Sequence, residues 1–147
     1  MYVPRWFRGV PACLDFAVTS GLRIDHLRNS AHDASAAVFA YEGYKCAYLD
    51  THAQCRAEGM AFIPMVMEGH GGGWGTEAAK FWSKLAKSHA LTSGELRASV
   101  LSRFLGALSI IVHRENARAI LRRAPQPHTS HGAGAGAAAA ILAASAD

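Results

Sequence analysis

A carboxylate in the middle of a predicted strand is the first feature of the sequence that could do chemistry. Residues 13–19, CLDFAVT, are rich in β-branched and aromatic side chains, and a Ser-Gly pair follows them as a turn would. An ionised carboxylate is rarely buried unless a cation, a hydrogen-bond donor or a metal ion pairs with it. Asp15 is therefore a candidate for ion pairing or metal binding.

A candidate partner for Asp15 lies in the segment AYEGYKCAYLD, residues 40–50. On a helix, Tyr41 and Lys45 share one face with Tyr48 or Leu49, whereas Glu42 lies one position round from Tyr41. If this face packs on a sheet, the Lys45 stem follows apolar surface and its ammonium reaches the rim. The ammonium would then form a purely structural pair with Asp15, or would share an anionic substrate with a metal ion bound to Asp15.

Two basic stripes at helical spacing are candidates for nucleic-acid binding. Either stripe is a solvated helix face or part of a surface that contacts phosphates. The residues are Lys80, Lys84 and Lys87 in one segment, and Arg114, Arg118 and Arg122 in a later one.

Two further groups offer weaker signals. Glu68 precedes the glycine-rich loop GHGGGWG, whose backbone N–H groups could hold a phosphate, although the Lys-Ser/Thr of a P-loop is missing. Cys46, His52 and Cys55 lack the two close ligand pairs that a zinc site usually has. Neither group is predicted to be the main site.

The elements that position these residues follow an α/β pattern. Arg8-Gly9 predicts a hairpin turn, with Pro4 and Pro11 indicating irregular or edge strands around it. The alanine-rich spacing of residues 31–58 predicts one long helix that begins near Ser30 or Asp33 and ends at Gly59, with Gly43 allowing another backbone to approach.

A short apolar run, MAFIPMVME at residues 60–68, predicts a buried strand after the long helix. Strand, helix and strand together predict a right-handed crossover between parallel strands. Pro64 places this second strand near an edge or at a bulge. The fold class is therefore α/β: a small mixed sheet of an N-terminal hairpin and one parallel strand, with a long crossover helix and two C-terminal helices.

The two C-terminal helices are predicted from their apolar spacing. The first covers residues 76–88, and the second begins where Thr92 and Glu95 have capping-box spacing and runs to Arg123. Residues 125–147 are an Ala/Gly-rich tail with little apolar bulk, which predicts disorder. Residues 1–124 thus form one predicted domain.

The length, net charge and cysteine count of the sequence limit the domain number, the partners and the cellular location. The 147 residues are enough for one domain, and a net charge of +4 permits a polyanionic partner without requiring one. Three cysteines make no disulfide framework, no segment has the features of a secretory signal, and no uncharged apolar run could span a bilayer. We expect an intracellular protein, nuclear or cytoplasmic, with no membrane association.

Three segments taken in order, LDFAVTS, AYEGYKCAYLD and GMAFIPMVMEGHGGGWG, resemble a known family. They are similar to the restriction-endonuclease-like domain, of the PD-(D/E)XK type, that follows the reverse transcriptase at the C-terminal end of some non-LTR retroelement polyproteins. The resemblance covers residues 1–90, extends more weakly to 124, and does not include the tail.

The resemblance implies a metal-dependent DNA nuclease. Asp15 matches the acid of the second strand and would bind Mg²⁺, which neutralises the scissile phosphate and activates water. Ala17 stands where the commoner nucleases place a lysine, and Lys45 matches the lysine that this branch carries on the following helix. Its role would be to stabilise developing charge.

One family residue has no counterpart in the sequence. The first acid, the Asp of PD, is expected about a dozen residues before Asp15, at or before residues 1–3, and no acidic residue precedes Asp15. A lone Asp15 would hold Mg²⁺ poorly. We therefore expect an N-terminally truncated remnant with weak or absent cleavage activity. The alternatives are a non-catalytic domain that binds nucleic acid through the basic helices, or a fragment with no selected role.

Overall fold

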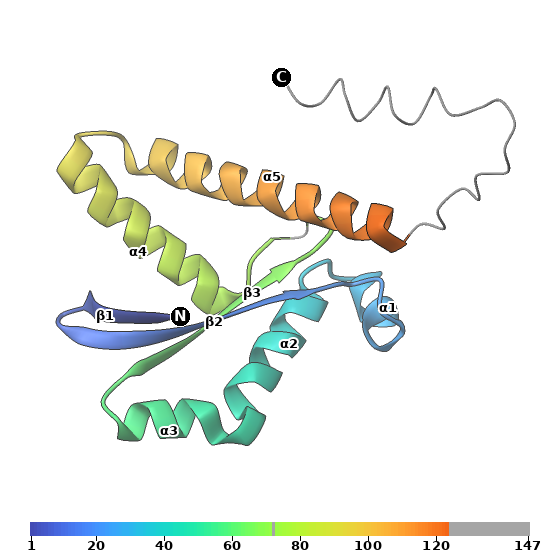
Figure 1. Ribbon diagram of the computed structural model, residues 1–147, viewed down its shortest axis with the longest axis horizontal. Helices are drawn as coiled ribbons and strands as arrows, with labels where there is room; N and C mark the ends of the chain where they lie inside the picture. The colour runs from blue at the N-terminus through green and yellow to red at the C-terminus, as the bar shows by residue number, and fades with distance from the viewer. Residues whose placement is uncertain (72, 124–147) are drawn as a thin grey trace, which may run out of the picture.

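The described residues form a small mixed sheet between two layers of helices, as the fold class predicts (Figure 1). The structure is a computed structural model that describes residues 1–71 and 73–123. The predicted disordered tail, residues 125–147, lies outside the described residues. The three strands lie in the order β1-β2-β3, so β2 is central and β1 and β3 are the edges.

The N-terminal hairpin is confirmed. Strands β1 (Tyr2–Phe7) and β2 (Val10–Thr19) pair antiparallel around Arg8 and Gly9, whose φ angles of 52° and 81° are left-handed. Two consecutive left-handed residues are typical of the tight turns that match strand twist. The register shifts between Val3 and Phe7, in the segment that contains Pro4, as that proline predicts.

Strand β3 (Ala61–Glu68) lies parallel to β2, which confirms the crossover. Pro64 is tolerated because β3 is an edge strand. The chain after β3 folds back along the open edge: the Gly75 amide donates to the Val66 carbonyl at 2.8 Å, and the Glu68 amide donates to the Gly73 carbonyl at 2.9 Å. This return segment occupies backbone groups that an open edge would otherwise leave unpaired.

The connection between β2 and β3 is broken into pieces, so the single predicted helix over residues 31–58 is wrong. Its elements are α1 (Ile24–Ser30), α2 (Ala36–Ala47), the short 3₁₀ turn η1 (Tyr48–Asp50) and α3 (Thr51–Ala57). The connection ends as predicted before Gly59, which has a left-handed φ of 70°.

The break between α2 and α3 falls at two residues with left-handed backbone. Leu49 and Asp50 have φ angles of 51° and 53°, which interrupts the helical hydrogen bonding. Two side chains donate hydrogen bonds to backbone carbonyls at the break. Thr51 Oγ1 donates to the Tyr48 carbonyl at 2.6 Å, and Gln54 Nε2 donates to the Leu49 carbonyl at 2.9 Å. Gly43 is not the reason for the break, and the predicted close approach there is also wrong, because a Cβ at Gly43 would meet no atom within 4 Å.

The helices cover the two faces of the sheet (Figure 1). Helix α4 (Thr76–Ser93), followed by α5 (Arg97–Arg123), lies on one side, and α2 and α3 lie on the other. The apolar core under α4 is made of residues that alternate along the strands and of two from the helix: Ala12, Leu14, Ile63, Met65, Ala78 and Phe81.

Helix α4 is longer than predicted, because the capping box assigned to Thr92 does not form. Thr92 Oγ1 donates to the His89 carbonyl of its own helix at 2.9 Å, and α4 continues to Ser93. Gly94, with a left-handed φ of 73°, ends the helix. Within the described ranges, no helix combines the length and apolar character that crossing a membrane requires.

Candidate functional site

Asp15 and Lys45 are in direct contact. Lys45 Nζ, from α2, lies 2.9 Å from Asp15 Oδ2 in the middle of β2. The side chains are 21% and 41% exposed respectively, so the pair lies at the rim of the α2 layer, where water and a ligand can reach it. The structure therefore brings together the two residues that the sequence singles out.

Asp15 stabilises the protonated form of Lys45. A hydrogen bond to Asp15 raises the pKa of Lys45 above its ordinary value, against the opposing effect of burial, and the Asp15 charge adds to the rise. The ammonium also lies 5.8 Å from the centre of the Tyr41 ring, within the range of a cation–π contact. Lys45 thus stays charged at neutral pH and is available to an anion.

Three tyrosines continue the surface beside Lys45, and we call them the tyrosine row: Tyr41, Tyr44 and Tyr48. Their spacing of three and four residues places them on one helical face. Ring centres are 5.6 Å apart between Tyr41 and Tyr44, and 5.4 Å apart between Tyr44 and Tyr48. Tyr44 and Tyr48 are 53% and 50% exposed. Half-exposed rings next to a cation form a surface on which a flat, anionic ligand can stack.

The surroundings of Asp15 do not fit Mg²⁺ well. Along the described chain no three side chains among His, Cys, Asp and Glu gather at one point. Across β3, Asp15 stands opposite Pro64, which has no oxygen in its side chain. One carboxylate that already holds an ammonium is a poor Mg²⁺ site.

The predicted basic stripes lie in the opposite helical layer, and much of their charge is engaged there. Lys80 Nζ contacts Glu77 at 2.7 Å, and Lys84 Nζ lies 4.5 Å from the centre of the Phe7 ring. Arg118 and Arg114 both contact Glu115, at 2.6 and 3.6 Å. Arg122 is exposed near the end of α5. These residues do not join Asp15 and Lys45 in one site.

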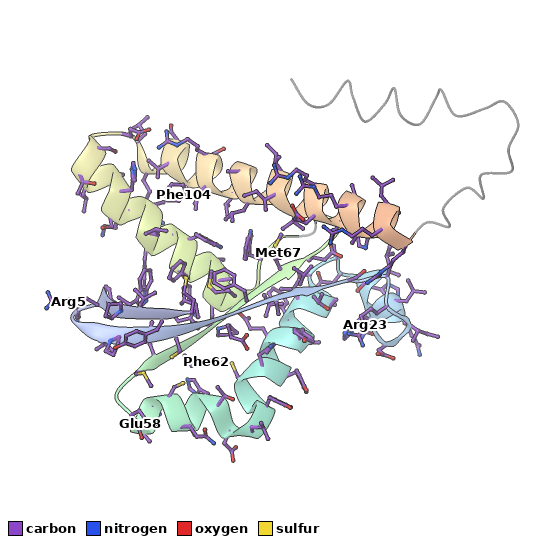
Figure 2. All side chains as sticks on the ribbon, in the orientation of Figure 1. Arg5, Arg23, Glu58, Phe62, Met67 and Phe104 are labelled. Carbon is purple, nitrogen blue, oxygen red and sulfur yellow. The ribbon has the colours of Figure 1, made fainter. Side chains whose placement is uncertain are left out.

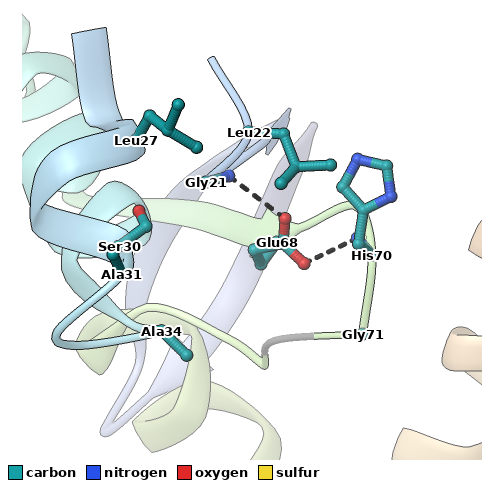
Figure 3. A pocket seen from close by; sticks show the side chains of 9 residues that line it. All are labelled: Gly21, Leu22, Leu27, Ser30, Ala31, Ala34, Glu68, His70 and Gly71. Carbon is teal, nitrogen blue, oxygen red and sulfur yellow. Dashed lines mark hydrogen bonds between the residues drawn. The ribbon is translucent and has the colours of Figure 1, made fainter. Parts of the chain in front are cut away.

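At the ends of β2 and β3, the Glu68 carboxylate binds backbone amides of the two segments that follow these strands (Figure 3). Its carboxylate is 5% exposed and accepts hydrogen bonds from the Gly21 amide at 3.3 Å and the His70 amide at 2.6 Å. It borders a pocket of about 400 Å³ whose other walls include Leu22, Leu27 and Ser30. A buried negative charge at this position disfavours the phosphate binding that the glycine-rich loop indicates.

Glu42 has a role that sequence reasoning missed. The residue is 9% exposed, and its carboxylate accepts hydrogen bonds from the Thr76 amide at 3.0 Å and the Glu77 amide at 2.7 Å. These are unpaired amides at the start of α4, where the N-cap residue Gly75 has no side chain to cap them. A Cβ on Gly75 would lie 2.7 Å from Glu42 Oε1, so glycine makes room for the carboxylate.

Comparison of the chain with protein-family models, with curated proteins and with solved structures finds no match.

Proposed function

We propose that this domain is a degenerate relative of the restriction-endonuclease-like domains of non-LTR retroelements, which binds DNA and cleaves it weakly or not at all. The observation that carries the proposal is the 2.9 Å contact between Asp15 in the central strand and Lys45 in the crossover connection. These are the positions at which the family resemblance expects an acid and a lysine. The hairpin and parallel crossover around them agree with that resemblance.

The tyrosine row supports DNA as the ligand. Aromatic side chains beside a cation are the usual means of binding single-stranded nucleic acid, because bases stack on the rings and the cation contacts the phosphates. Tyr44 and Tyr48 expose about half of their surface, and Lys45 lies between them in the sequence. We place a phosphate at Lys45 and one or two bases over the exposed rings.

The weakness of the metal site supports the loss of cleavage. Asp15 offers one carboxylate, and its Oδ2 already contacts Lys45. Mg²⁺ sites of nucleases use one or two carboxylates together with substrate phosphates in near-octahedral geometry. A pair in which the ammonium neutralises the acid is better suited to holding a phosphate beside Lys45 than to activating water.

Nicking of supercoiled plasmid in Mg²⁺ or Mn²⁺ tests the cleavage part of the proposal. We expect the chain to nick no faster than its Asp15→Ala variant. Metal-dependent nicking that disappears in Asp15→Ala would contradict the proposal and show that a working nuclease site survives.

Fluorescence anisotropy with a labelled single-stranded oligonucleotide tests the binding part. We expect Lys45→Met to weaken binding and to reduce the slope of log affinity against log salt by about 0.7, the value for one phosphate contact on a single strand. Tyr44→Ala should cost about 1–3 kcal/mol of binding free energy per lost base stack. Lys80→Met, on the opposite layer, is the matched control. Equal losses in Lys45→Met and Lys80→Met would contradict binding at α2.

A second candidate function is non-catalytic nucleic-acid binding by the basic helices. The observation in its favour is a pocket of about 300 Å³ at the ends of β2 and β3, lined by Arg23, Asn116 and Arg123 among others. Two guanidinium groups beside one pocket suit a phosphate. Under this alternative, Arg23→Ala and Arg123→Ala weaken DNA binding, whereas Lys45→Met and Asp15→Ala have no effect.

A further inference from the structure

Three sulfur-containing side chains from separate segments meet on the α2 and α3 side of the sheet, and we call them the sulfur cluster: Cys13, Cys55 and Met60. Cys13 lies in β2, Cys55 in α3, and Met60 just before β3. Figure 2 shows sulfur atoms gathered between α3 and the strands. The cluster is independent of the proposed function, and neither DNA binding nor cleavage requires it.

The contacts within the sulfur cluster are direct. Cys13 Sγ lies 4.0 Å from Met60 Sδ. Burial raises the pKa of the Cys55 thiol, and the neighbouring Cys13 raises it further through its charge and a side-chain hydrogen bond. Cys13 therefore neighbours Cys55 as well as contacting Met60, and Cys55 and Met60 line one pocket. The Met60 amide donates to the Cys55 carbonyl at 2.8 Å, which fixes the backbone of those two residues relative to each other.

The separation of Cys13 Sγ and Met60 Sδ matches that of two ligands in a three-coordinate metal site. Three sulfur ligands at about 2.3 Å from a central ion, the usual thiolate distance for zinc, are separated from one another by about 4 Å. The Cys13–Met60 separation of 4.0 Å equals that edge. The two side chains would need little movement to bind one ion together.

The chemistry of the ligands selects the metal. Thiolate and thioether sulfur are soft ligands that favour Cu(I), whereas zinc prefers four ligands drawn from thiolate, imidazole and carboxylate. We infer that Cys13, Cys55 and Met60 form a binding site for one Cu(I) ion. Both thiols release their protons to solvent as the ion binds, and the oxidation state of copper does not change.

An entry path exists beside the sulfur cluster. A surface pocket of about 370 Å³ is lined by Gln54, Cys55, Ala57, Glu58 and Met60. Two of the three members of the sulfur cluster line it, so we expect an ion delivered by a soluble chelator to reach them without unfolding of the domain.

The third cysteine provides a matched control. Cys46 lies on α2, and burial and the charges of Glu42 and Glu77 raise the pKa of its thiol. Its neighbours therefore differ from those of the sulfur cluster. Substitution of Cys46 removes one thiol from the chain without removing a predicted ligand.

Titration of the full chain with Cu(I), without oxygen and in competition with a Cu(I) chelator, tests the inference. We expect one ion per chain, a loss of affinity of about 100-fold in Cys13→Ser and in Cys55→Ser, and of about tenfold in Met60→Leu. Cys46→Ser should bind as the wild type does. X-ray absorption of the wild-type complex should show three sulfur neighbours at about 2.3 Å.

Three results would overturn the inference. Unchanged affinity in Met60→Leu would reduce the site to a pair of thiols, and equal weakening in Cys46→Ser would make binding non-specific. An absorption spectrum with two sulfur neighbours would also contradict it. Because that spectrum uses the wild-type chain, the test holds even if a cysteine variant fails to fold, and the volume-conserving Met60→Leu change is expected to preserve the fold.

Discussion

The two faces of the sheet use the same strands for different purposes. Toward α4, alternate positions of β2 and β3 hold apolar side chains such as Leu14 and Met65, which are 2% and 0% exposed. Toward α2 and α3, the intervening positions include Cys13, Asp15 and Glu68. Along β2, one residue of offset therefore separates a close-packed core from a face that carries charge and sulfur, whereas β3 is buried on both faces, with Val66 of β3 0% exposed and Val38 of α2 1% exposed.

The difference shows how a small domain can tolerate polar groups in its central strands. Asp15 is paired with an ammonium and Glu68 with backbone amides, so neither carboxylate is without a partner. Changes at the charged rim of the α2 face, where Asp15 and Lys45 lie, are expected to alter binding more than folding. Substitutions on each face can break or support this division.

The largest expected effect is on the α4 face. Met65 is fully buried, and Met65→Ala should lower the free energy of unfolding by about 3 kcal/mol through lost burial and the cavity that it leaves. Urea denaturation followed by circular dichroism measures the change. Phe16→Ala, at a β2 position where the ring is 49% exposed, should cost clearly less despite the larger side chain removed. Because Phe16 pairs with Met65 on the same face of the sheet, equal costs would mean that the extent of burial does not set the cost.

The next largest effect is expected at Glu42, which joins the two layers. Glu42→Ala should lower the free energy of unfolding by about 2 kcal/mol, because it leaves the first amides of α4 without their acceptors. Glu42→Gln keeps one acceptor oxygen and should cost less. Thermal melts of both variants beside Glu58→Ala, an exposed site, provide the measurement. A Glu42→Ala melt that matches Glu58→Ala would show that the cap contributes nothing.

A smaller effect, dependent on pH, is expected at Lys45. Because the pKa of Lys45 is raised by its bond to Asp15, the pair stabilises the folded state below the ordinary lysine pKa, and this contribution is lost as pH rises through the higher folded value. At neutral pH, Lys45→Met should cost at most about 1 kcal/mol, since Asp15 is well exposed. Urea denaturation of both proteins should show the difference shrinking as pH rises above 10.5, the ordinary lysine pKa. A difference that grows with pH would contradict the pairing.

The smallest effect is expected on the outer surface of α4. Lys80→Ala removes a pair with Glu77 in which both side chains are exposed, and should change the free energy of unfolding by less than about 0.5 kcal/mol. The measurement is the same denaturation experiment, repeated at low and high salt. A cost above 1 kcal/mol would show that the basic stripe has a structural role.

The parts of the fold that could be predicted carry their signals locally. Arg8-Gly9 marks the hairpin turn, and the apolar run before Gly69 marks β3. The break between α2 and α3 could not be predicted, because Leu49 and Asp50 adopt left-handed backbone without a glycine or proline to indicate it. Thr92 misled for a related reason: a capping-box spacing does not exclude a hydroxyl that bonds within its own helix.

The candidate site was partly predictable for the same physical reason. The Asp15–Lys45 contact follows from a strand carboxylate and a helix that crosses the same sheet, so residue type and topology suffice. Glu42 acts on amides 34 and 35 residues away, and Cys13 meets Met60 across 47 residues. These contacts depend on where the return segment after β3 and helix α3 end in space, and the periodicity of the sequence does not determine those positions.

The parallel pairing of β2 with β3 also sets the order in which the domain assembles. The hairpin needs only a two-residue turn, whereas the Gly21–Glu68 bond joins residues 47 positions apart and must wait for the whole crossover to close. Contacts between distant residues form slowly, because the entropy of closing a long loop is lost before the contact is made. The Asp15–Lys45 pair and the sulfur cluster should therefore form in the late, rate-limiting phase of refolding, after the hairpin. The rate at which ligand binding appears during refolding then reports the rate at which the crossover closes.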